Sequence, residues 1–338
     1  MKVLLLARST LYTQPGGDTV QIVETAKALN AARIESDIFL KGESIPFMRY
    51  DIVHFFNLGR PADILPYLPQ IRVPIVVSTI FVEYDKSRFQ NLIEYVKTIG
   101  RWMNGSDSYP GWLYIQMRHK KAVQLVIDRA KYLITTTPKE AKRLKANWTI
   151  DKTPRTIPLG LNELYHKKHK PQEKKGALVV GRLESLKNQK AAILASNDLK
   201  LPLKVIGNPA RNQPKYAEEC KKLAGESVSF LSFMETEELI TEYRKAEFLI
   251  LPSQFETFGL VALEAWSQGC KLVLSKNIES YDFFKDKAIF FDPNDKNDLI
   301  RALDIAKNLA SSPPSKSELE SLSWSTIVNE VERIYEAC

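Results

Sequence analysis

The sequence predicts an α/β protein of two domains, each built around a parallel β-sheet. Three observations support this prediction: the length of 338 residues, the alternation of strand-like and helical patterns from end to end, and a polar segment near the middle. A chain of this length exceeds one ordinary domain. Strands that alternate with helices form βαβ units, and the strands of such units run parallel.

Short apolar runs bounded by turn signals predict six strands in each half of the chain. In the first half they cover residues 2–7, 36–40, 52–55, 75–78, 132–136 and 156–158. In the second half they cover residues 177–180, 203–206, 228–231, 248–251, 272–274 and 288–291. Helical patterns fill the gaps, for example at residues 19–32 and 139–146. The two halves therefore share one architecture, although no sequence repeat relates them.

A polar, proline-bearing stretch without apolar periodicity separates the two halves and predicts an inter-domain connection at residues 163–175. The first domain is then expected to cover residues 1–162 and the second residues 176–322. Residues 323–338 predict a terminal amphipathic helix, which packs either on its own domain or back on the first.

The composition indicates a globular protein, with 44% hydrophobic and 26% charged residues. The first apolar run stops after five residues, short of the roughly 7–15 that a signal peptide needs. No stretch approaches the roughly 20 apolar residues of a membrane span. The three scattered cysteines fit neither a disulfide framework nor a zinc site, so we expect reduced thiols in a cytoplasmic protein.

A net charge of +8 suits a nucleic acid, an anionic membrane surface or a phosphorylated substrate, and does not choose among them. Residues 100–121 mix aromatic side chains such as Trp102 and Trp112 with cations such as Arg101 and Lys120. Such a mixture is typical of a membrane headgroup interface. A loop folded on its own domain and a subunit contact explain it equally.

The segment 252–265 carries the first chemical signal. A buried strand ends at Pro252, a short loop follows, and a helix is expected to open near Phe258 and Gly259. Loops at the carboxyl ends of parallel strands are where open α/β sheets bind ligands. Glu256 in the loop and Glu264 in the helix can reach different parts of one extended ligand. The free backbone amides at the helix start suit a diphosphate.

The segment 180–188 carries the second signal, again where a strand leaves its sheet. Arg182 and Lys187 bring two cations to that edge. Charge that builds on a departing diphosphate needs stabilisation, and Arg and Lys supply it without a metal. Neither segment is specific alone, because a surface Glu or a solvated Lys is ordinary. Their order and their separation of about 75 positions make the combination specific.

With these residues the chain resembles the family 4 retaining glycosyltransferases, also called group 1 glycosyl transferases, of the GT-B fold. Glu256 and Glu264 match the E-x7-E pair of that family, and Arg182 and Lys187 match its diphosphate-binding cations. The resemblance continues in segments 15–18 and 157–162. It implies two Rossmann-like domains whose parallel sheets face across a cleft, with the acceptor side in the first domain and the nucleotide-sugar donor side in the second.

The resemblance also implies roles for individual residues. Glu264 is expected to bind the ribose hydroxyls, while Glu256 holds the donor sugar and Arg182 and Lys187 stabilise the leaving diphosphate. Further donor-side residues are expected at Gly16, Gly17, Gly181, Gly207, Asn208, Thr257, Phe258, Gly259 and Leu260. Members of the family work without a metal or cofactor. The donor substrate is a nucleotide-sugar, for which UDP is favoured over GDP or ADP.

The chain departs from the family at one position. Many members carry a His where Phe81 stands here, which weakens any mechanism that depends on that His. Glu83, Tyr84 or Asp85 could supply a polar group instead. His54 could line the acceptor side or cap the third strand, and Trp112 is a further acceptor-side candidate.

The resemblance implies a hexosyltransferase-type enzyme that acts on a glycan or lipid-linked acceptor in bacterial surface polysaccharide or glycolipid synthesis. It would work in the cytoplasm or at the inner face of the plasma membrane. A non-catalytic partner of the same fold and a nucleotide-sugar epimerase are the alternatives. A nucleic-acid partner is not expected, because the main lysine run lies in the predicted connection.

Overall fold

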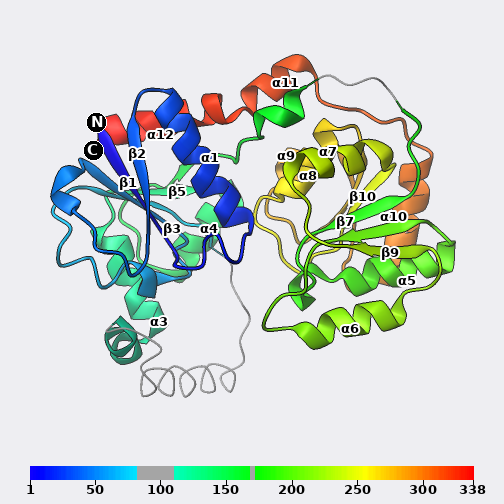
Figure 1. Ribbon diagram of the computed structural model, residues 1–338, viewed down its shortest axis with the longest axis horizontal. Helices are drawn as coiled ribbons and strands as arrows, with labels where there is room; N and C mark the ends of the chain where they lie inside the picture. The colour runs from blue at the N-terminus through cyan, green and yellow to red at the C-terminus, as the bar shows by residue number, and fades with distance from the viewer. Residues whose placement is uncertain (82–109, 168–171) are drawn as a thin grey trace. The chain divides into compact units, whose positions relative to one another are not determined.

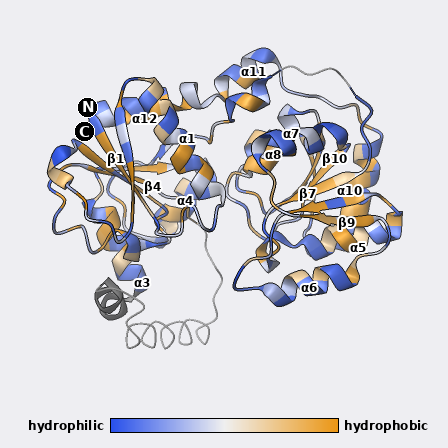
Figure 2. Cartoon of the chain, viewed as in Figure 1, coloured by the Kyte–Doolittle hydropathy of each residue, from blue (hydrophilic) through white to orange (hydrophobic). Residues whose placement is uncertain are grey.

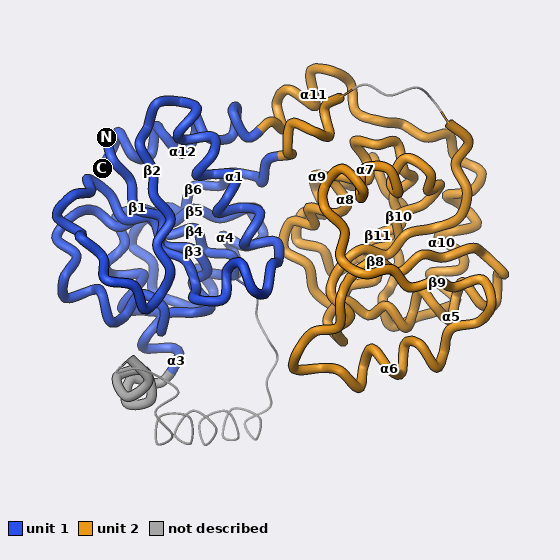
Figure 3. Tube along the Cα trace, in the orientation of Figure 1, with its two compact units in different colours: residues 1–160, 324–338 blue, residues 161–323 orange. Residues whose placement is uncertain are grey.

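The computed structural model describes residues 1–81, 110–167 and 172–338, with side chains omitted for residues 110–118 (Figure 1). The chain forms two compact units (Figure 3). Unit 1 combines Met1–Gly160 with Trp324–Cys338, and unit 2 is Leu161–Ser323. The terminal helix α12 (Trp324–Glu336) is therefore part of unit 1.

Unit 1 contains a six-stranded parallel sheet in the order β2-β1-β3-β4-β5-β6. Because the strand order reverses beside β1, the loops that follow β1 and β3 flank the topological switch point, where ligands bind in open α/β sheets. The strands are β1 (Lys2–Ala7), β2 (Glu35–Leu40), β3 (Ile52–Phe56), β4 (Ile75–Ser78), β5 (Tyr132–Thr135) and β6 (Arg155–Thr156). The helical elements besides α12 are α1 (Gly17–Ala31), η1 (Phe47–Arg49), η2 (Pro61–Asp63), α3 (Pro110–Arg129) and α4 (Pro138–Asn147).

Unit 2 contains a second six-stranded parallel sheet in the order β12-β11-β10-β7-β8-β9, with its switch point between β7 and β10. The strands are β7 (Ala177–Val180), β8 (Leu203–Ile206), β9 (Val228–Leu231), β10 (Phe248–Leu251), β11 (Lys271–Ser275) and β12 (Ala288–Phe291). The helical elements are η3 (Glu163–His166), η4 (Ser185–Lys187), α5 (Gln189–Leu199), α6 (Pro214–Leu223), α7 (Thr236–Lys245), α8 (Leu260–Ser267), α9 (Tyr281–Phe284), α10 (Lys296–Lys307) and α11 (Lys316–Ser321). Helices α5, α6 and α10 cover one face of this sheet, and α7 and α8 cover the other (Figure 1).

The predicted fold class, two α/β domains with parallel sheets, is confirmed. All twelve predicted strands are present, and the largest error in their bounds concerns the last strand of unit 1. We expected it at residues 156–158, but β6 ends at Thr156. Pro158 has no N–H with which to continue a ladder.

The strands form the cores of both units, as the hydropathy colouring shows (Figure 2). Val53, Phe55 and Val77 are fully buried in unit 1, and Ile250 and Val273 are fully buried in unit 2. Parallel strands covered by helices on both faces are apolar at successive positions rather than at alternate ones. Because the strands are buried on both faces, they appear in the sequence as short apolar runs and could be predicted.

Much of the predicted connection at residues 163–175 packs on unit 2. Tyr165 in η3 is only 3% exposed. The Lys174 ammonium donates to the main-chain carbonyls of Tyr243 (3.1 Å), Ala246 (3.2 Å) and Gln268 (3.0 Å), at the carboxyl ends of α7 and α8. A cation at the carboxyl end of a helix is stabilised by the helix dipole. The boundary between the units therefore falls earlier, between Gly160 and Leu161.

The expectation that His54 lines the acceptor side or caps the third strand is wrong. His54 lies in the middle of β3 and is 1% exposed. Its Nδ1 is 2.6 Å from the Tyr335 hydroxyl of α12, and its Nε2 is 2.9 Å from Ser78 Oγ. The imidazole thus attaches the terminal helix to the sheet of unit 1, and burial lowers its pKa from 6.5 to about 3.

His54 predicts a pH dependence of stability. Since its pKa is lower in the fold than in the unfolded chain, its contribution is complete above pH 6.5 and is lost as the pH falls toward 3. Below pH 6.5 the free energy of unfolding should fall by about 1.4 kcal/mol per pH unit, or by roughly 2 kcal/mol in total at pH 5. Chemical denaturation of the wild type and of His54→Gln at several pH values measures it. If the free energy of unfolding fell equally steeply with pH in both proteins, the pH dependence could not be due to His54.

A glycine contact joins the loops that follow β7 and β8. Gly207 has a φ of +144°, and a Cβ added there would lie 2.2 Å from the carbonyl oxygen of Gly181. Both the backbone conformation and the space therefore exclude a side chain.

We expect Gly207→Ala to lower the free energy of unfolding by about 2 kcal/mol or more, because it adds a main-chain clash to an unfavourable φ. Gly17→Ala is the matched control. Gly17 has an ordinary φ, and no described atom lies within 4 Å of a Cβ added there. Thermal denaturation should lower the Tm only for the Gly207 variant. A wild-type Tm in both would show that the loops can move apart freely.

Candidate functional site

The two segments singled out in the second half of the sequence lie together at the carboxyl edge of the sheet of unit 2. Segment 180–188 follows β7 and segment 252–265 follows β10, and these strands are neighbours in the sheet. The topological switch point falls between them. The main-chain N–H of Gln254 donates to the carbonyl of Leu186 (2.8 Å), which ties one segment to the other. The strand topology therefore places the candidate residues at the edge where α/β sheets bind ligands.

Lys187 and Glu256 form the central contact of this edge. Lys187 Nζ lies 2.5 Å from Glu256 Oε2, and both side chains are mostly buried, at 24% and 14% exposure. The buried Ser253 hydroxyl donates to the same oxygen at 3.4 Å. A bond between charged groups in a partly buried place is stronger than one at an open surface. The pair therefore holds both loops in a defined position.

Arg182 is more open, with a side chain that is 48% exposed. Its guanidinium lies 3.3 Å from Glu184 Oε1, and Glu184 itself is 12% exposed. The Arg182 carbonyl accepts a bond from Gln189 Nε2 (2.8 Å) at the start of α5. The main chain of Arg182 is thus fixed while its planar head is left available to an anion.

The loop before α8 is anchored through its main chain. The Glu256 carbonyl accepts from the N–H of Glu279 (2.9 Å), and the Phe258 carbonyl accepts from Ser280 Oγ (2.6 Å). Gly259 caps α8 with a φ of +80°, and a Cβ there would lie 2.9 Å from Ile278 Cδ1. The first amides of α8, beginning at Leu260, have no acceptor within the helix, as at every helix start. Thr257 lies in the same loop, between these anchors.

Glu264 lies in α8, about one turn from its start. Its Oε2 accepts a bond from the Tyr243 hydroxyl of α7 at 3.0 Å. Burial raises the pKa of this carboxyl to about 7, while the Tyr243 and Tyr165 hydroxyls lower it. Glu264 is therefore partly buried beside two tyrosines.

The remaining donor-side candidates of unit 2 lie along the same edge. Gly181 and Gly207 directly follow β7 and β8. Asn208 is occupied in holding its loop, because its carbonyl accepts from the Leu183 N–H (3.0 Å) and its side chain accepts from the Phe233 N–H (3.2 Å). We therefore see Asn208 as part of the frame of the site.

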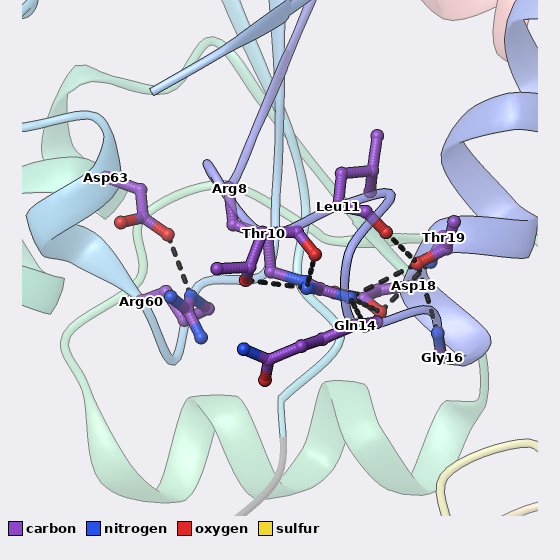
Figure 4. Close-up of polar contacts among 9 residues, drawn as sticks. All are labelled: Arg8, Thr10, Leu11, Gln14, Gly16, Asp18, Thr19, Arg60 and Asp63. Carbon is purple, nitrogen blue, oxygen red and sulfur yellow. Dashed lines mark hydrogen bonds and ion pairs between the residues drawn. The ribbon is translucent and has the colours of Figure 1, made fainter. Parts of the chain in front are cut away.

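In unit 1 the loop that contains Gly16 and Gly17 is organised by a buried Arg8 (Figure 4). Its guanidinium contacts both oxygens of Asp18, at 2.6 and 3.0 Å. It also donates to the carbonyls of Thr10 (2.6 Å) and Gln14 (2.8 Å). Sequence reasoning missed Arg8, although a charged residue directly after a buried strand is a usable signal.

Other acceptor-side candidates are only partly accounted for. Glu83 lies outside the described residues, and Trp112 lies in the first turn of α3 with its side chain outside the description. Phe81 is buried, and its N–H donates to Glu140 Oε1 at 2.8 Å. The Glu140 carboxylate also accepts from Thr79 Oγ1 (2.5 Å) and the Thr136 N–H (2.7 Å). This buried carboxylate organises the end of β4, and the local sequence does not indicate such a role for Glu140.

The described part of the chain contains neither a metal-binding cluster nor a helix that could span a membrane. No group of three or more His, Cys, Asp and Glu side chains there could hold a metal ion. None of the helices in residues 1–81, 110–167 and 172–338 is long and apolar enough to cross a membrane.

A family model matches the half of the chain that carries these residues. Residues 162–316 match the family described as Glycosyl transferases group 1, and this stretch contains Arg182, Lys187, Glu256 and Glu264. A D-inositol 3-phosphate glycosyltransferase of Corynebacterium urealyticum is 38% identical over 109 residues, which are 29% of this chain and 26% of that protein. The chain thus spans about a quarter of the length of the curated relatives that it matches.

Solved structures resemble the chain over its whole length. Sucrose-phosphate synthase from Thermosynechococcus elongatus has a TM-score of 0.74 at 16% identity, over 99% of this chain and 98% of that one. HepE from Anabaena, solved in complex with UDP, has a TM-score of 0.73 at 14% identity and full coverage of both chains. A second HepE structure contains UDP and glucose. Unit 2, which holds every matched residue, is therefore similar to the group 1 glycosyl transferases, and the chain has the GT-B fold of these neighbours.

Proposed function

We propose that the protein transfers a sugar from a nucleotide diphosphate donor to a hydroxyl of an acceptor, with retention of anomeric configuration. The observation that carries the proposal is the Lys187–Glu256 pair beside the exposed Arg182, at the switch point of unit 2. Lys187 and Glu256 are 69 positions apart in the sequence and meet at the edge where this type of sheet binds ligands. Retention is the outcome typical of the family.

The proposed chemistry needs charge stabilisation at one place. As the bond between sugar and diphosphate breaks, negative charge builds on the leaving phosphate oxygens. Arg182 and Lys187 would neutralise that charge, since guanidinium and ammonium groups are strong phosphate partners. The first amides of α8 would add neutral donors. Glu256, held by Lys187, would bind the hydroxyls of the donor sugar, and Glu264 would bind the ribose.

The proposed donor is a UDP-sugar, because the structurally similar HepE was solved in complex with UDP. The sugar is proposed to be a hexose. The acceptor is proposed to be a glycan or a lipid-linked intermediate, used in the cytoplasm at the inner face of the membrane. The positive net charge suits that anionic surface.

Calorimetric titration of UDP, GDP and ADP tests the donor site. We expect one of them to bind the wild type, and Arg182→Ala and Glu264→Ala each to weaken it about 10- to 100-fold, the range for a hydrogen bond to a charged group. Lys296→Ala is the matched control, because that lysine pairs with Asp198 on the surface of the same unit. Repetition with a chelator tests for a metal requirement. Absence of binding by all three nucleotides would favour a non-catalytic partner protein instead.

The stereochemical outcome tests the reaction class. With an identified donor and acceptor, proton NMR of the first product should show the anomeric configuration of the donor. Lys187→Ala should reduce kcat by at least about tenfold with a smaller change in KM, because the ammonium acts most on the charge of the transition state. An inverted product would refute the family-based mechanism. Conversion of the donor without any acceptor would indicate an epimerase.

A further inference from the structure

We propose that Tyr243 and Tyr165 are positioning residues, whose hydroxyls keep the Glu264 carboxylate ionised and oriented for the ribose of the nucleotide. This inference rests on the proposed function, because it assumes that Glu264 meets the ribose. It goes beyond that function by assigning the pH dependence of nucleotide binding to two tyrosines, neither of which belongs to the E-x7-E pair.

The geometry places three elements around one carboxyl group. Glu264 is on α8, Tyr243 is on α7 and Tyr165 is in η3, and both α7 and η3 pack on α8. The Tyr243 hydroxyl lies 3.0 Å from Glu264 Oε2. The two tyrosine rings lie 6.4 Å apart, centroid to centroid. Tyr243 is completely buried and Tyr165 is 3% exposed, whereas Glu264 keeps some exposure and remains open to a ligand.

The main chain of each tyrosine is itself fixed by polar contacts. The Tyr243 carbonyl accepts from Lys174 Nζ at 3.1 Å and from Cys270 Sγ at 2.9 Å. The Tyr165 carbonyl accepts from Gln268 Nε2 at 2.9 Å, at the end of the helix that carries Glu264. The hydroxyls are therefore held at the carboxyl by bonds at the other end of each residue. Such support is what a precise binding group requires.

The electrostatics explain why the hydroxyls are needed. Burial favours the neutral form of Glu264 and raises its pKa to about 7, and the two hydroxyls act against this shift. Burial also raises the pKa of both tyrosines, so each hydroxyl keeps its proton and remains a donor. Lys174 and Cys270 are the other titratable groups of this cluster, and both contact the Tyr243 carbonyl rather than the carboxyl.

A consequence for binding follows. An ionised carboxylate accepts bonds from tyrosine and ribose hydroxyls together, whereas a protonated one loses part of that capacity to its own O–H. Nucleotide affinity should therefore fall as the pH drops through about 7. Since the Tyr243 hydroxyl lowers the pKa of Glu264, its removal should move this fall to a higher pH.

The experiment is a calorimetric pH profile of binding, with whichever of UDP, GDP and ADP binds the wild type. Wild type, Tyr243→Phe, Tyr165→Phe and Glu264→Gln are titrated from about pH 5.5 to pH 9, a range centred on the shifted carboxyl. The Gln variant cannot titrate at this position, so its profile subtracts the ionisation of the phosphate itself. Tyr216→Phe is the matched control, because its hydroxyl bonds to the Lys190 N–H and not to Glu264.

We expect the midpoint of the corrected profile to rise by about one pH unit in Tyr243→Phe, the equivalent of one hydrogen bond to a charged group. Near pH 9 its affinity should return to within a few-fold of wild type, and Tyr216→Phe should leave the midpoint unchanged. A loss of affinity that is equal at every pH would mean that the hydroxyl has only a structural role, and would overturn the inference.

Tyr165→Phe gives a second reading if the buried Tyr243 variant does not fold. Its midpoint should move in the same direction, and an unchanged midpoint in a folded Tyr165 variant would also overturn the inference. If no nucleotide binds the wild type at any pH, the proposed donor site itself fails, and the inference fails with it. The two failures are therefore distinguishable.

Discussion

The parallel pairing of buried strands is the constraint on which the rest of this structure depends. Each unit covers both faces of its sheet with helices, so apolar side chains such as Val53 and Ile250 occupy successive strand positions. The charged candidates Arg182 and Glu256 lie instead in the loops that follow the strands. In unit 2 the reversal of strand order beside β7 opens one edge between two sets of loops, and the charged residues lie there.

Charge at that edge is balanced in pairs. Lys187 lies against Glu256 and Arg182 lies near Glu184, so each of these two cations has a carboxylate partner. The pairs differ in exposure, and this difference divides their tasks. The more buried pair defines the distance between the loops after β7 and β10. The more open Arg182 keeps its guanidinium available to an anionic ligand.

The described residues of the predicted connection, 163–167 and 172–175, have more structure than their composition indicates. Among them is Lys174, whose ammonium donates hydrogen bonds to three main-chain carbonyls at two helix ends. Tyr165 is buried in η3, which packs on the helix that carries Glu264. Lys174 and Tyr165 thus belong to the frame of the site. His54 is the counterpart in unit 1, where an imidazole became a buried tie between β3 and α12.

Glu264 and Lys187 illustrate two levels of predictability. Spacing along the chain identified both residues, because strand–loop–helix segments repeat a local pattern that one sequence can reveal. The spacing did not predict which residues these two side chains would contact. Tyr243 lies 21 positions from Glu264, and Glu256 lies 69 positions from Lys187. No local rule states which helix will pack on which, so these contacts came only from the fold.

By itself the sequence determined the strands, their parallel class and the positions of the charged loops, since these depend on apolar burial and on nearby turn residues. The tertiary structure decided the rest: the burial of His54, the anchoring of Lys174, the Glu140 carboxylate beneath Phe81, and the joining of α12 to unit 1. Each of these is a bond between groups distant in the chain. The strength of such a bond depends on desolvation and geometry, and both arise only when each unit has folded.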